Sequence, residues 1–392
     1  MKTPRNIKIA LAALTVVAVV AAAAAVTAAP DRGETHEELL QREQKLQHAL
    51  DQLVAAGVPG AILLVREDDQ TIRLASGYGN LKPKTPIRAT DRFRVGSITK
   101  AFVATLVLQL VGEGKLALED TVERRLPGVV PHGERITVRQ LLNHTSGLFD
   151  YGGDEKWLAA AYRDPMRDWN PREIVGVATS HEPHFAPAAH WSYSNTNYYV
   201  LGLIVESVTG RSLGSELGRR IFAPLRLRAT SFDTAPTIAG RHAHGYFLKP
   251  LEDVTVGSPS IVWASGAVVS NADNLARFFG ALLGGRLLSP ELLREMKAMI
   301  PTEASFSYGL GLQKLRLPCG AVWGHQGGMP GFSTEALSSQ DGRRQVVVSV
   351  NATDVLTPSL KNFRSFNTPE RAGPALERLI QAAYCAGQEE ER

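Results

Sequence analysis

The spacing of apolar residues changes along the chain, and each spacing predicts a different kind of element. Leucines recur at near-helical intervals between residues 34 and 56, and Gly57 follows as a stop signal. Two strand-like runs, residues 61–65 and 71–77, are separated by the polar turn Asp68-Asp69-Gln70. This part of the pattern predicts a helix followed by a β-hairpin.

The middle of the chain carries helix signals and few strand signals. A long apolar run begins soon after Gly96, and Gly210 ends another. Pro171 stands where a helix can begin, because its missing N–H is not needed there. We expect helices or short helical segments over residues 101–111, 116–126, 137–142, 171–178, 197–209 and 213–222.

Strand patterns return in the last third of the chain. They are mixed with three further helix signals, over residues 271–283, 290–300 and 369–383. The strand-like runs cover residues 308–317, 321–324, 334–337 and 344–350.

Strands therefore cluster at both ends of the chain, and helices fill the middle. The simplest packing joins the two ends in one antiparallel sheet, flanked by the terminal helices, with a helical lobe inserted. We predict an α+β fold in which residues 29–92 and 266–392 form the sheet lobe and residues 93–265 the helical lobe. A cleft at the junction of the lobes is the expected place for a ligand.

The N-terminus predicts a signal peptide. Three basic residues precede an apolar stretch, residues 9–26, and Val26-Thr27-Ala28 offers small side chains to a signal peptidase. We place the signal at residues 1–28 and expect an exported protein. The apolar stretch also approaches the ~20 residues of a membrane span, so an uncleaved anchor is the alternative.

Composition argues against a nucleic-acid partner. The formal net charge of +4 falls to +1 when the three basic residues of the signal are removed. Outside the signal, basic residues form only short pairs such as Arg343-Arg344. The two cysteines, Cys319 and Cys385, lack the neighbouring His or Cys residues of a zinc site. Export permits a disulfide between them, which we favour over two buried thiols.

The tetrapeptide Ser97-Ile98-Thr99-Lys100 holds the first candidate chemistry. A hydroxyl and an amine three residues apart at a helix start lie on one face, about one turn apart. An almost wholly apolar run follows Lys100, and desolvation there would lower the pKa of its amine. The amine could then take the proton of Ser97. The alternative is an N-cap serine beside a solvated lysine.

Two further motifs carry groups that such a pair needs. Tyr193-Ser194-Asn195 offers a proton shuttle and an amide that can hold a carbonyl, although it could also be a capping loop. His325-Gln326-Gly327-Gly328 follows a short strand, and its glycines would let a substrate backbone approach the strand edge. Its alternative is a strand-to-turn transition with a surface histidine.

Together, in this order, the three motifs resemble those of the penicillin-recognising serine hydrolases. The tyrosine of the second motif points to the branch that holds class C β-lactamases and D-Ala-D-Ala carboxypeptidases. The greatest similarity is to D-Ala-D-Ala carboxypeptidases exported by actinobacteria, over roughly residues 45–385. Supporting stretches are residues 93–96, 109–116, 142–148 and 308–312. The resemblance implies a β-lactamase/transpeptidase-like fold and a disulfide between Cys319 and Cys385.

The resemblance also implies a role for each motif residue. Ser97 would be acylated, Lys100 and Tyr193 would share proton transfer, Asn195 would position the substrate amide, and His325 would line the opposite wall. The backbone N–H groups of Ser97 and Gly328 would form the oxyanion hole. The residues expected to line the substrate site are Trp263, Gln313, Gln326 and Gly327.

Two positions depart from the carboxypeptidase pattern. Gln313 stands where an arginine of that family grips the terminal carboxylate of the substrate, and Gln326 and Gly328 replace hydroxyl residues. A glutamine does not replace a bidentate arginine clamp. The acylation groups are therefore complete, whereas recognition of a free C-terminal D-alanine is open.

The sequence thus predicts an exported, monomeric serine hydrolase that forms an acyl-enzyme and uses no metal or other cofactor. The first expectation is D-Ala-D-Ala carboxypeptidase activity on peptidoglycan stem peptides, with β-lactams as inhibitors or substrates. An esterase or β-lactamase on the same scaffold is the first alternative. A non-catalytic receptor for β-lactams or cell-wall fragments is the second.

Overall fold

The computed structural model describes residues 35–354 and 369–386. The predicted signal peptide, its cleavage site and the alternative anchor lie outside these residues. The chain divides into two units, residues 1–41 and 42–392, and the second unit contains the sheets and the cleft. Within the described ranges, no helix is long and apolar enough to cross a membrane.

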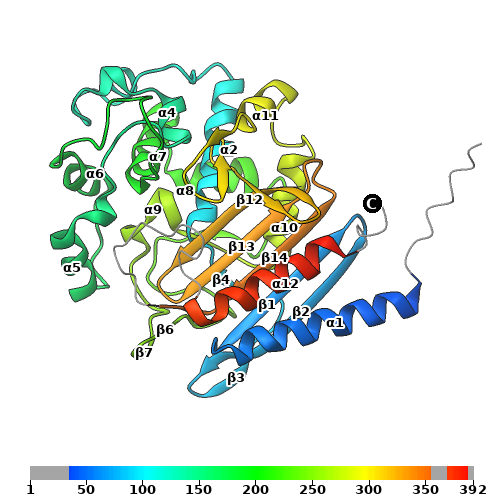
Figure 1. Cartoon of the computed structure of the whole chain (residues 1–392). Coiled ribbons are helices and arrows are strands. Elements are labelled where there is room, and N and C mark those ends of the chain that lie inside the picture. The colour runs from blue at the N-terminus through cyan, green and yellow to red at the C-terminus, as the bar shows by residue number, and fades with distance from the viewer. Residues whose placement is uncertain (1–34, 355–368, 387–392) are drawn as a thin grey trace, which may run out of the picture. The chain divides into compact units, whose positions relative to one another are not determined.

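The strands from the two ends of the chain form one antiparallel sheet, as predicted (Figure 1). Strand β1 pairs with β2 on one side and with β14 on the other, so that Ala61 lies opposite Val350. The described strands follow the order β3-β2-β1-β14-β13-β12-β11-β10-β9 across the sheet. Their bounds are β1 Gly60–Glu67, β2 Gln70–Leu81, β3 Lys84–Pro86, β9 Ile300–Pro301, β10 Phe306–Tyr308, β11 Gln313–Leu317, β12 Gly320–Met329, β13 Phe332–Ser338 and β14 Arg344–Val350.

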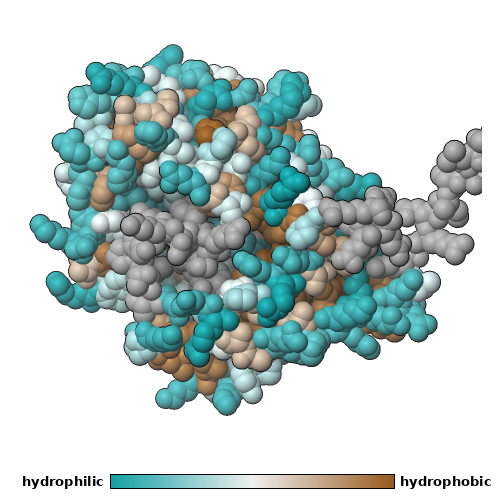
Figure 2. Space-filling model, viewed as in Figure 1, coloured by the Kyte–Doolittle hydropathy of each residue, from teal (hydrophilic) through white to brown (hydrophobic). Residues whose placement is uncertain are grey.

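Helices pack on both faces of the sheet. Its central strands therefore carry apolar residues at successive positions, with alternate residues on opposite faces. On one face, Leu63 and Val348 pack with the leucines of helix α1 and with Leu379 of helix α12. On the other face, Leu64 and Val347 belong to the core that contains helices α2 and α10. Helix α1 spans His36–Ala55, α2 Thr99–Gly112, α10 Ala272–Leu283 and α12 Gly373–Cys385. Figure 2 shows that hydrophilic side chains cover much of the viewed surface, with apolar ones in smaller patches between them.

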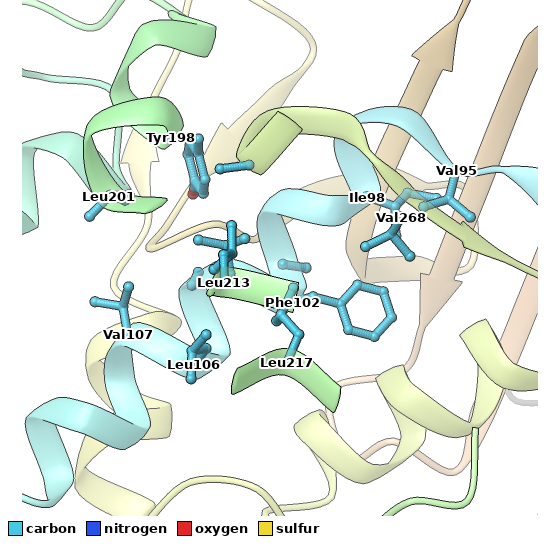
Figure 3. Close-up of a cluster of buried hydrophobic side chains, with 14 of the residues drawn as sticks. Val95, Ile98, Phe102, Leu106, Val107, Tyr198, Leu201, Leu213, Leu217 and Val268 are labelled. Atoms are coloured by element: carbon cyan, nitrogen blue, oxygen red, sulfur yellow. The ribbon is translucent and has the colours of Figure 1, made fainter. Parts of the chain in front are cut away.

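Helix α2 is the centre of the larger core (Figure 3). Its side chains are buried on all sides, so it needs no polar face. Phe102 stacks on Phe278 of α10 at 3.8 Å between ring centroids and meets Phe222 edge-on. Tyr198 and Leu201 of α7 and Leu213 of α8 close the other side. The helix that begins at the Ser97 tetrapeptide is therefore held by packing along its whole length.

The remaining helices lie mainly between residues 122 and 266, as the sequence predicted. Helix α4 begins with a capping box in which Thr137 and Gln140 bond each other's backbone N–H groups. Two small three-stranded sheets, which the sequence did not reveal, are β4-β8-β5 and β15-β6-β7. The bounds are α3 Val122–Arg125, α4 Val138–Leu142, α5 Glu155–Arg163, α6 Pro171–Thr179, α7 Asn195–Thr209, α8 Leu213–Leu217, α9 Trp263–Gly266, α11 Pro290–Met296, β4 Phe93–Arg94, β5 Ser231–Phe232, β6 Tyr246–Leu248, β7 Leu251–Asp253, β8 Val268–Ser270 and β15 Ala352–Thr353.

Two strand predictions were wrong in extent. The run at residues 308–317 is split into β10 and β11, because Gly311 adopts a φ of +73° between them. The strand predicted to end at residue 324 continues to Met329, so the His325 motif lies inside β12 and not beyond its end. Gly327 and Gly328 remain paired with Thr334 and Ser333 of β13, and this pairing carries the strand through the glycines.

Cys319 and Cys385 are joined, with a sulfur–sulfur distance of 1.99 Å, in the pairing that the sequence predicted. The bond ties the turn before β12 to the end of α12 and closes a loop with a sequence separation of 66 residues. Whether the bond forms in the cell depends on the compartment, which stays a prediction.

Replacing both cysteines with serine is expected to lower the free energy of unfolding by about 4 kcal/mol, since a loop of this length then regains its freedom in the unfolded state. Denaturant titration of the oxidised wild type, the reduced wild type and the double variant measures this. Equal stability of all three would show that the bond contributes nothing.

Candidate active site

Ser97 lies in a turn of 3₁₀-helix, Gly96–Ile98, directly before α2. Gly96 adopts a φ of +53°, which favours glycine, and its Cα faces the backbone of Gly328 on β12. A Cβ on Gly96 would lie 2.5 Å from the Gly328 carbonyl oxygen. The close approach brings this turn and the β12 backbone together, while the oxyanion hole from the Ser97 and Gly328 N–H groups stays a prediction.

Lys100 is fully buried beside Ser97. Its Nζ lies 3.0 Å from Ser97 Oγ, 2.8 Å from Asn195 Oδ1 and 2.9 Å from the backbone oxygen of Ser265. Burial lowers the pKa of Lys100 to about 7, although the nearby Asp150 carboxylate opposes this shift. A large fraction of the amine is therefore neutral near pH 7, and a neutral amine can accept the Ser97 proton.

Tyr193 completes the group around Ser97. Lys100 Nζ lies 4.8 Å from the centroid of the Tyr193 ring. That ring lies against His144, with 4.3 Å between the centroids and an angle of 32° between the planes. Burial raises the pKa of Tyr193 well above its ordinary value, and a hydrogen bond with Ser97 only partly opposes this. The phenol therefore keeps its proton at neutral pH, so Tyr193 is able to donate a proton, and Lys100 is able to accept one.

Asn195 is oriented by a residue that the sequence analysis missed. The buried Asp150 carboxylate accepts hydrogen bonds from Asn195 N and from Asn195 Nδ2, both at 3.1 Å. This holds Oδ1 toward Lys100 and leaves the second Nδ2 hydrogen for another acceptor, such as a substrate carbonyl. In the sequence, Asp150 is marked only by its position just beyond the polar stretch 143–148. Spacing along the chain could not relate it to Asn195.

Replacing Asp150 with asparagine is expected to lower the acylation rate about 10- to 100-fold, since one buried donor of Asn195 loses its acceptor at a cost of about 1–3 kcal/mol. The loss of the carboxylate also lowers the pKa of Lys100, because Asp150 now raises it. The midpoint of the pH–rate profile should therefore move to lower pH. Asp154→Asn is the matched control, because asparagine caps helix α5 as well as aspartate does. An unchanged profile in Asp150→Asn would contradict the positioning role.

His325 is buried on the sheet face that carries Ala336, its partner on β13. Both ring nitrogens are engaged, Nε2 with the Tyr308 hydroxyl at 3.0 Å and Nδ1 with the Gln326 carbonyl at 2.5 Å. Burial lowers the pKa of His325 to about 3, with Lys100 contributing in the same direction. His325 is therefore neutral and fixes the local β12 backbone, while its part in proton transfer stays a prediction.

Gln313 on β11 and Gln326 on β12 lie together in the part of the cleft wall that these two strands form. Gln313 is buried, and its Oε1 accepts a hydrogen bond from the Gln326 backbone N–H at 3.0 Å. Opposite Gln326 on β13 stands Glu335, a second cleft residue that the sequence analysis did not single out. Nothing in its local spacing marks it, because its place depends on the register of β12 and β13.

The expectation for Trp263 needs correction. Its ring packs on helix α7, with the centroid 5.6 Å from that of Tyr199 and with carbon atoms close to Gly202. The residues of the same segment that line the cleft are Ile261, Val262 and Ser265. The sequence pattern located the segment but not which side chain turns toward the substrate.

The active-site region contains one cleft with a volume of about 480 Å³. Ser97, Tyr193, Asn195 and Gly328 lie in its wall. An apolar arm is formed by α5 and the β6–β7 hairpin, through Trp157, Ala161, Tyr162, Phe247, Val254 and Val256. Among the residues that the structure describes, no three His, Cys, Asp or Glu side chains are grouped to hold a metal ion.

A family model described as Beta-lactamase matches residues 46–363. The chain belongs to the beta-lactamase family. The predicted resemblance to penicillin-recognising serine hydrolases and the predicted α+β fold are therefore confirmed. The chain is a serine hydrolase of this family.

Relatives of the chain carry different names. Penicillin-binding protein 4* of Bacillus subtilis is 28% identical over 313 residues, which cover 74% of this chain and 68% of that protein. A D-aminopeptidase of Brucella anthropi is 27% identical over 306 residues, 75% of this chain and 56% of its own length.

Solved structures add two amide hydrolases. A D-stereospecific amidohydrolase from Streptomyces sp. is 37% identical, with a TM-score of 0.77 over 88% of this chain and 98% of that one. The D-amino acid amidase from Ochrobactrum anthropi SV3, complexed with D-phenylalanine, is 27% identical. Its TM-score is 0.77, and the match covers 87% of this chain and 98% of that one.

Proposed function

We propose that the protein hydrolyses amide bonds of D-amino acid derivatives through an acyl-enzyme on Ser97. The observation that carries the proposal is the contact of 3.0 Å between Lys100 Nζ and Ser97 Oγ in a closed environment that keeps much of the amine neutral. A nucleophile with an adjacent, deprotonated base is what acyl transfer requires.

The reaction follows from the positions of the groups. Lys100 takes the Ser97 proton while Oγ attacks the substrate carbonyl carbon, and the oxyanion forms against the Ser97 and Gly328 N–H groups. Tyr193 then donates its proton to the leaving nitrogen, the C–N bond breaks, and the acyl group remains on Ser97. Lys100 returns its proton to Tyr193. Water attacks the ester carbonyl in the second half and gives its proton to the same relay. The relay protonates Ser97 Oγ as its bond to the acyl carbon breaks, which releases the acid and restores the free enzyme.

The substrate class is supported by the uncharged amides of Gln313 and Gln326 and by the relatives. Neither amide supplies the full positive charge that grips a terminal carboxylate most strongly. The apolar arm of the cleft suits an aliphatic or aromatic side chain. The names of the Streptomyces and Ochrobactrum enzymes support D-stereospecific amide substrates.

D-Ala-D-Ala carboxypeptidase activity on stem peptides is the second candidate. It is favoured by the complete Ser97, Lys100, Tyr193 and Asn195 group and by the Cys319–Cys385 pairing, both of which the sequence associated with that branch. Gln313→Arg would supply a carboxylate clamp, so it should raise D-alanine release if this activity is present but weak. Esterase and β-lactamase activities use the same acyl-enzyme.

The test compares release of ammonia from D- and L-phenylalanine amide with D-alanine release from a model stem peptide, hydrolysis of a short acyl ester, and hydrolysis of nitrocefin. We expect the D-amide to be the best amide substrate. Intact-mass analysis with penicillin should show an adduct on the wild type and none on Ser97→Ala. An adduct that survives Ser97→Ala, or binding of substrates without any turnover, would overturn the proposal and favour a receptor.

We also propose export through residues 1–28 and a monomeric state. Fractionation of expressing cells, the N-terminal sequence of the mature protein and its mass in solution test these points.

A further inference from the structure

Glu335 places a carboxyl group in the cleft that the acylation step does not use. It lies on β13 directly opposite Gln326, and its other neighbour across the sheet is Val348 of β14. Paired residues of antiparallel strands point to the same face, so Glu335 and Gln326 share one side of the sheet. Both line the cleft that holds Ser97.

Among the described residues, no charged side chain of the elements packed against β13 is paired with Glu335. Val348 shares its face with Leu379 of α12, and the charged residues in and just before that helix, Arg371, Glu377 and Arg378, are exposed to solvent. His325 of β12 and helix α10, with Asp273 and Arg277, belong to the opposite face. Arg344 of β14 forms an ion pair with Glu67. The nucleophile turn, Gly96–Ile98, and β15 bring no charged side chain in their described residues. The polar side chains that share this part of the cleft wall with Glu335 are Ser333, Gln313 and Gln326. The other charged residues of the cleft, Arg94, Asp150, Glu252 and Asp253, belong to other segments of the chain.

Burial raises the pKa of Glu335 to about 8, and a hydrogen bond with Gln326 opposes the rise. Glu335 is therefore mostly protonated at neutral pH when the cleft is empty. A cation brought next to it would favour the ionised form, whereas a second carboxylate would repel that form. If a bound cation lowers this pKa by one unit, the cation binds about tenfold more tightly to the protein with ionised Glu335 than to the protein with neutral Glu335.

We propose that Glu335, together with Gln313 and Gln326, selects substrates by charge: this wall favours a substrate group that is cationic or donates N–H bonds, and it disfavours a free carboxylate. The inference rests on the proposed acyl transfer at Ser97 and names the substrate class of that same site. Amides and ammonium-bearing D-amino acid derivatives meet this requirement, whereas peptides ending in a free carboxylate next to the wall do not.

The selectivity is expected to depend on pH. Below about pH 7 Glu335 is neutral, and the preference for a cation should be small. As the pH rises through about 8, Glu335 ionises and the preference should grow. The titration of Lys100 is common to all substrates, so it cancels when the rates of two substrates are divided.

The experiment uses three acetyl-D-alanyl amides that differ in the group on the leaving nitrogen: a carboxylate, a carboxamide and a guanidinium, whose charge does not titrate in this range. We expect the ratio of kcat/KM for guanidinium over carboxylate to be about tenfold or more at pH 9 and to approach 1 at pH 6. Glu335→Gln should flatten this dependence, and Glu377→Gln, an equal change of net charge on the exposed side of α12, should not. D-Phenylalanine amide and its N-acetyl derivative form a second pair, with the charge on the acyl side.

Two results would overturn the inference. The wild type could show equal kcat/KM for charged and neutral substrates, whether the charge is on the leaving group or on the acyl side. Alternatively, Glu335→Gln could keep the charge preference of the wild type. If no D-amide is hydrolysed, the proposed function fails, but the charge preference is still measurable. Bursts of 4-nitrophenol from cationic, neutral and anionic acyl esters then report acylation of Ser97, with the same expected loss of preference in Glu335→Gln. Penicillin adducts on each variant confirm that the acylation groups remain intact.

Discussion

Replacing Lys100 with methionine is expected to lower the acylation rate of Ser97 by about 10²- to 10⁴-fold, the range that a positioned general base supplies. Methionine is close to lysine in size and apolar, so the space around α2 stays filled. What disappears is the only amine within 3.0 Å of Ser97 Oγ among the described residues. Stopped-flow measurement of penicillin acylation, with melting curves to confirm folding, gives the result.

The pH dependence of the wild type makes this prediction sharper. Since burial lowers the pKa of Lys100 from 10.5 to about 7, the neutral amine becomes the main form as the pH rises through about 7. The acylation rate should therefore rise to a plateau above that value, and Lys100→Met should lose the inflection. Lys115→Met, which removes an exposed lysine just beyond the same helix, is the matched control. A wild-type rate that falls between pH 6 and 8 would contradict Lys100 as the base.

Replacing Gly327 with alanine is expected to lower the acylation rate at least 100-fold, because a displacement of about 1 Å is enough to have this effect. The added Cβ would lie 1.9 Å from the Val95 carbonyl oxygen and 3.2 Å from Ile98 Cγ1. Backbone atoms of the nucleophile turn cannot rotate away, so β12 and that turn must separate. The Gly328 N–H would then leave the oxyanion position.

A loss of about 1–3 kcal/mol in the free energy of unfolding should accompany this change, as for other overpacked sites. Gly176→Ala in helix α6 is the control, since no atom lies within 4 Å of its added Cβ. It should be neutral or stabilise the protein by about 0.5–1 kcal/mol. Wild-type acylation by Gly327→Ala would show that the close approach of β12 is not needed.

The parts of the fold that local patterns determine could be predicted. The β1–β2 hairpin follows from two strand-like runs around a polar turn, and the joining of the chain ends follows from the clustering of strands there. Ser97, Lys100, Tyr193 and Asn195 were found because each sits in a short motif whose residue types have complementary chemistry. The structure brings the other three around Lys100.

The parts that depend on tertiary register could not be predicted. Asp150 contacts Asn195, which is distant in sequence, and Glu335 reaches the cleft through the register of β13 against β12, which places it opposite Gln326. Trp263 turns toward α7 because of the space over Gly202, which no local pattern reveals. The length of β12 was underestimated because glycine usually weakens a strand, whereas here the glycines permit the approach to Val95.

The pairing of β1 with β14 has a consequence for the order of events during synthesis. Residues 60–67 emerge from the ribosome long before residues 344–350, so the apolar edge of β1 must wait for almost the entire chain before its partner exists. Among the described strands, β14 is the one that joins the wall formed by β12 and β13 to β1. The sheet that carries this wall is therefore completed late, when a segment near the C-terminus pairs with one of the first segments to be synthesised.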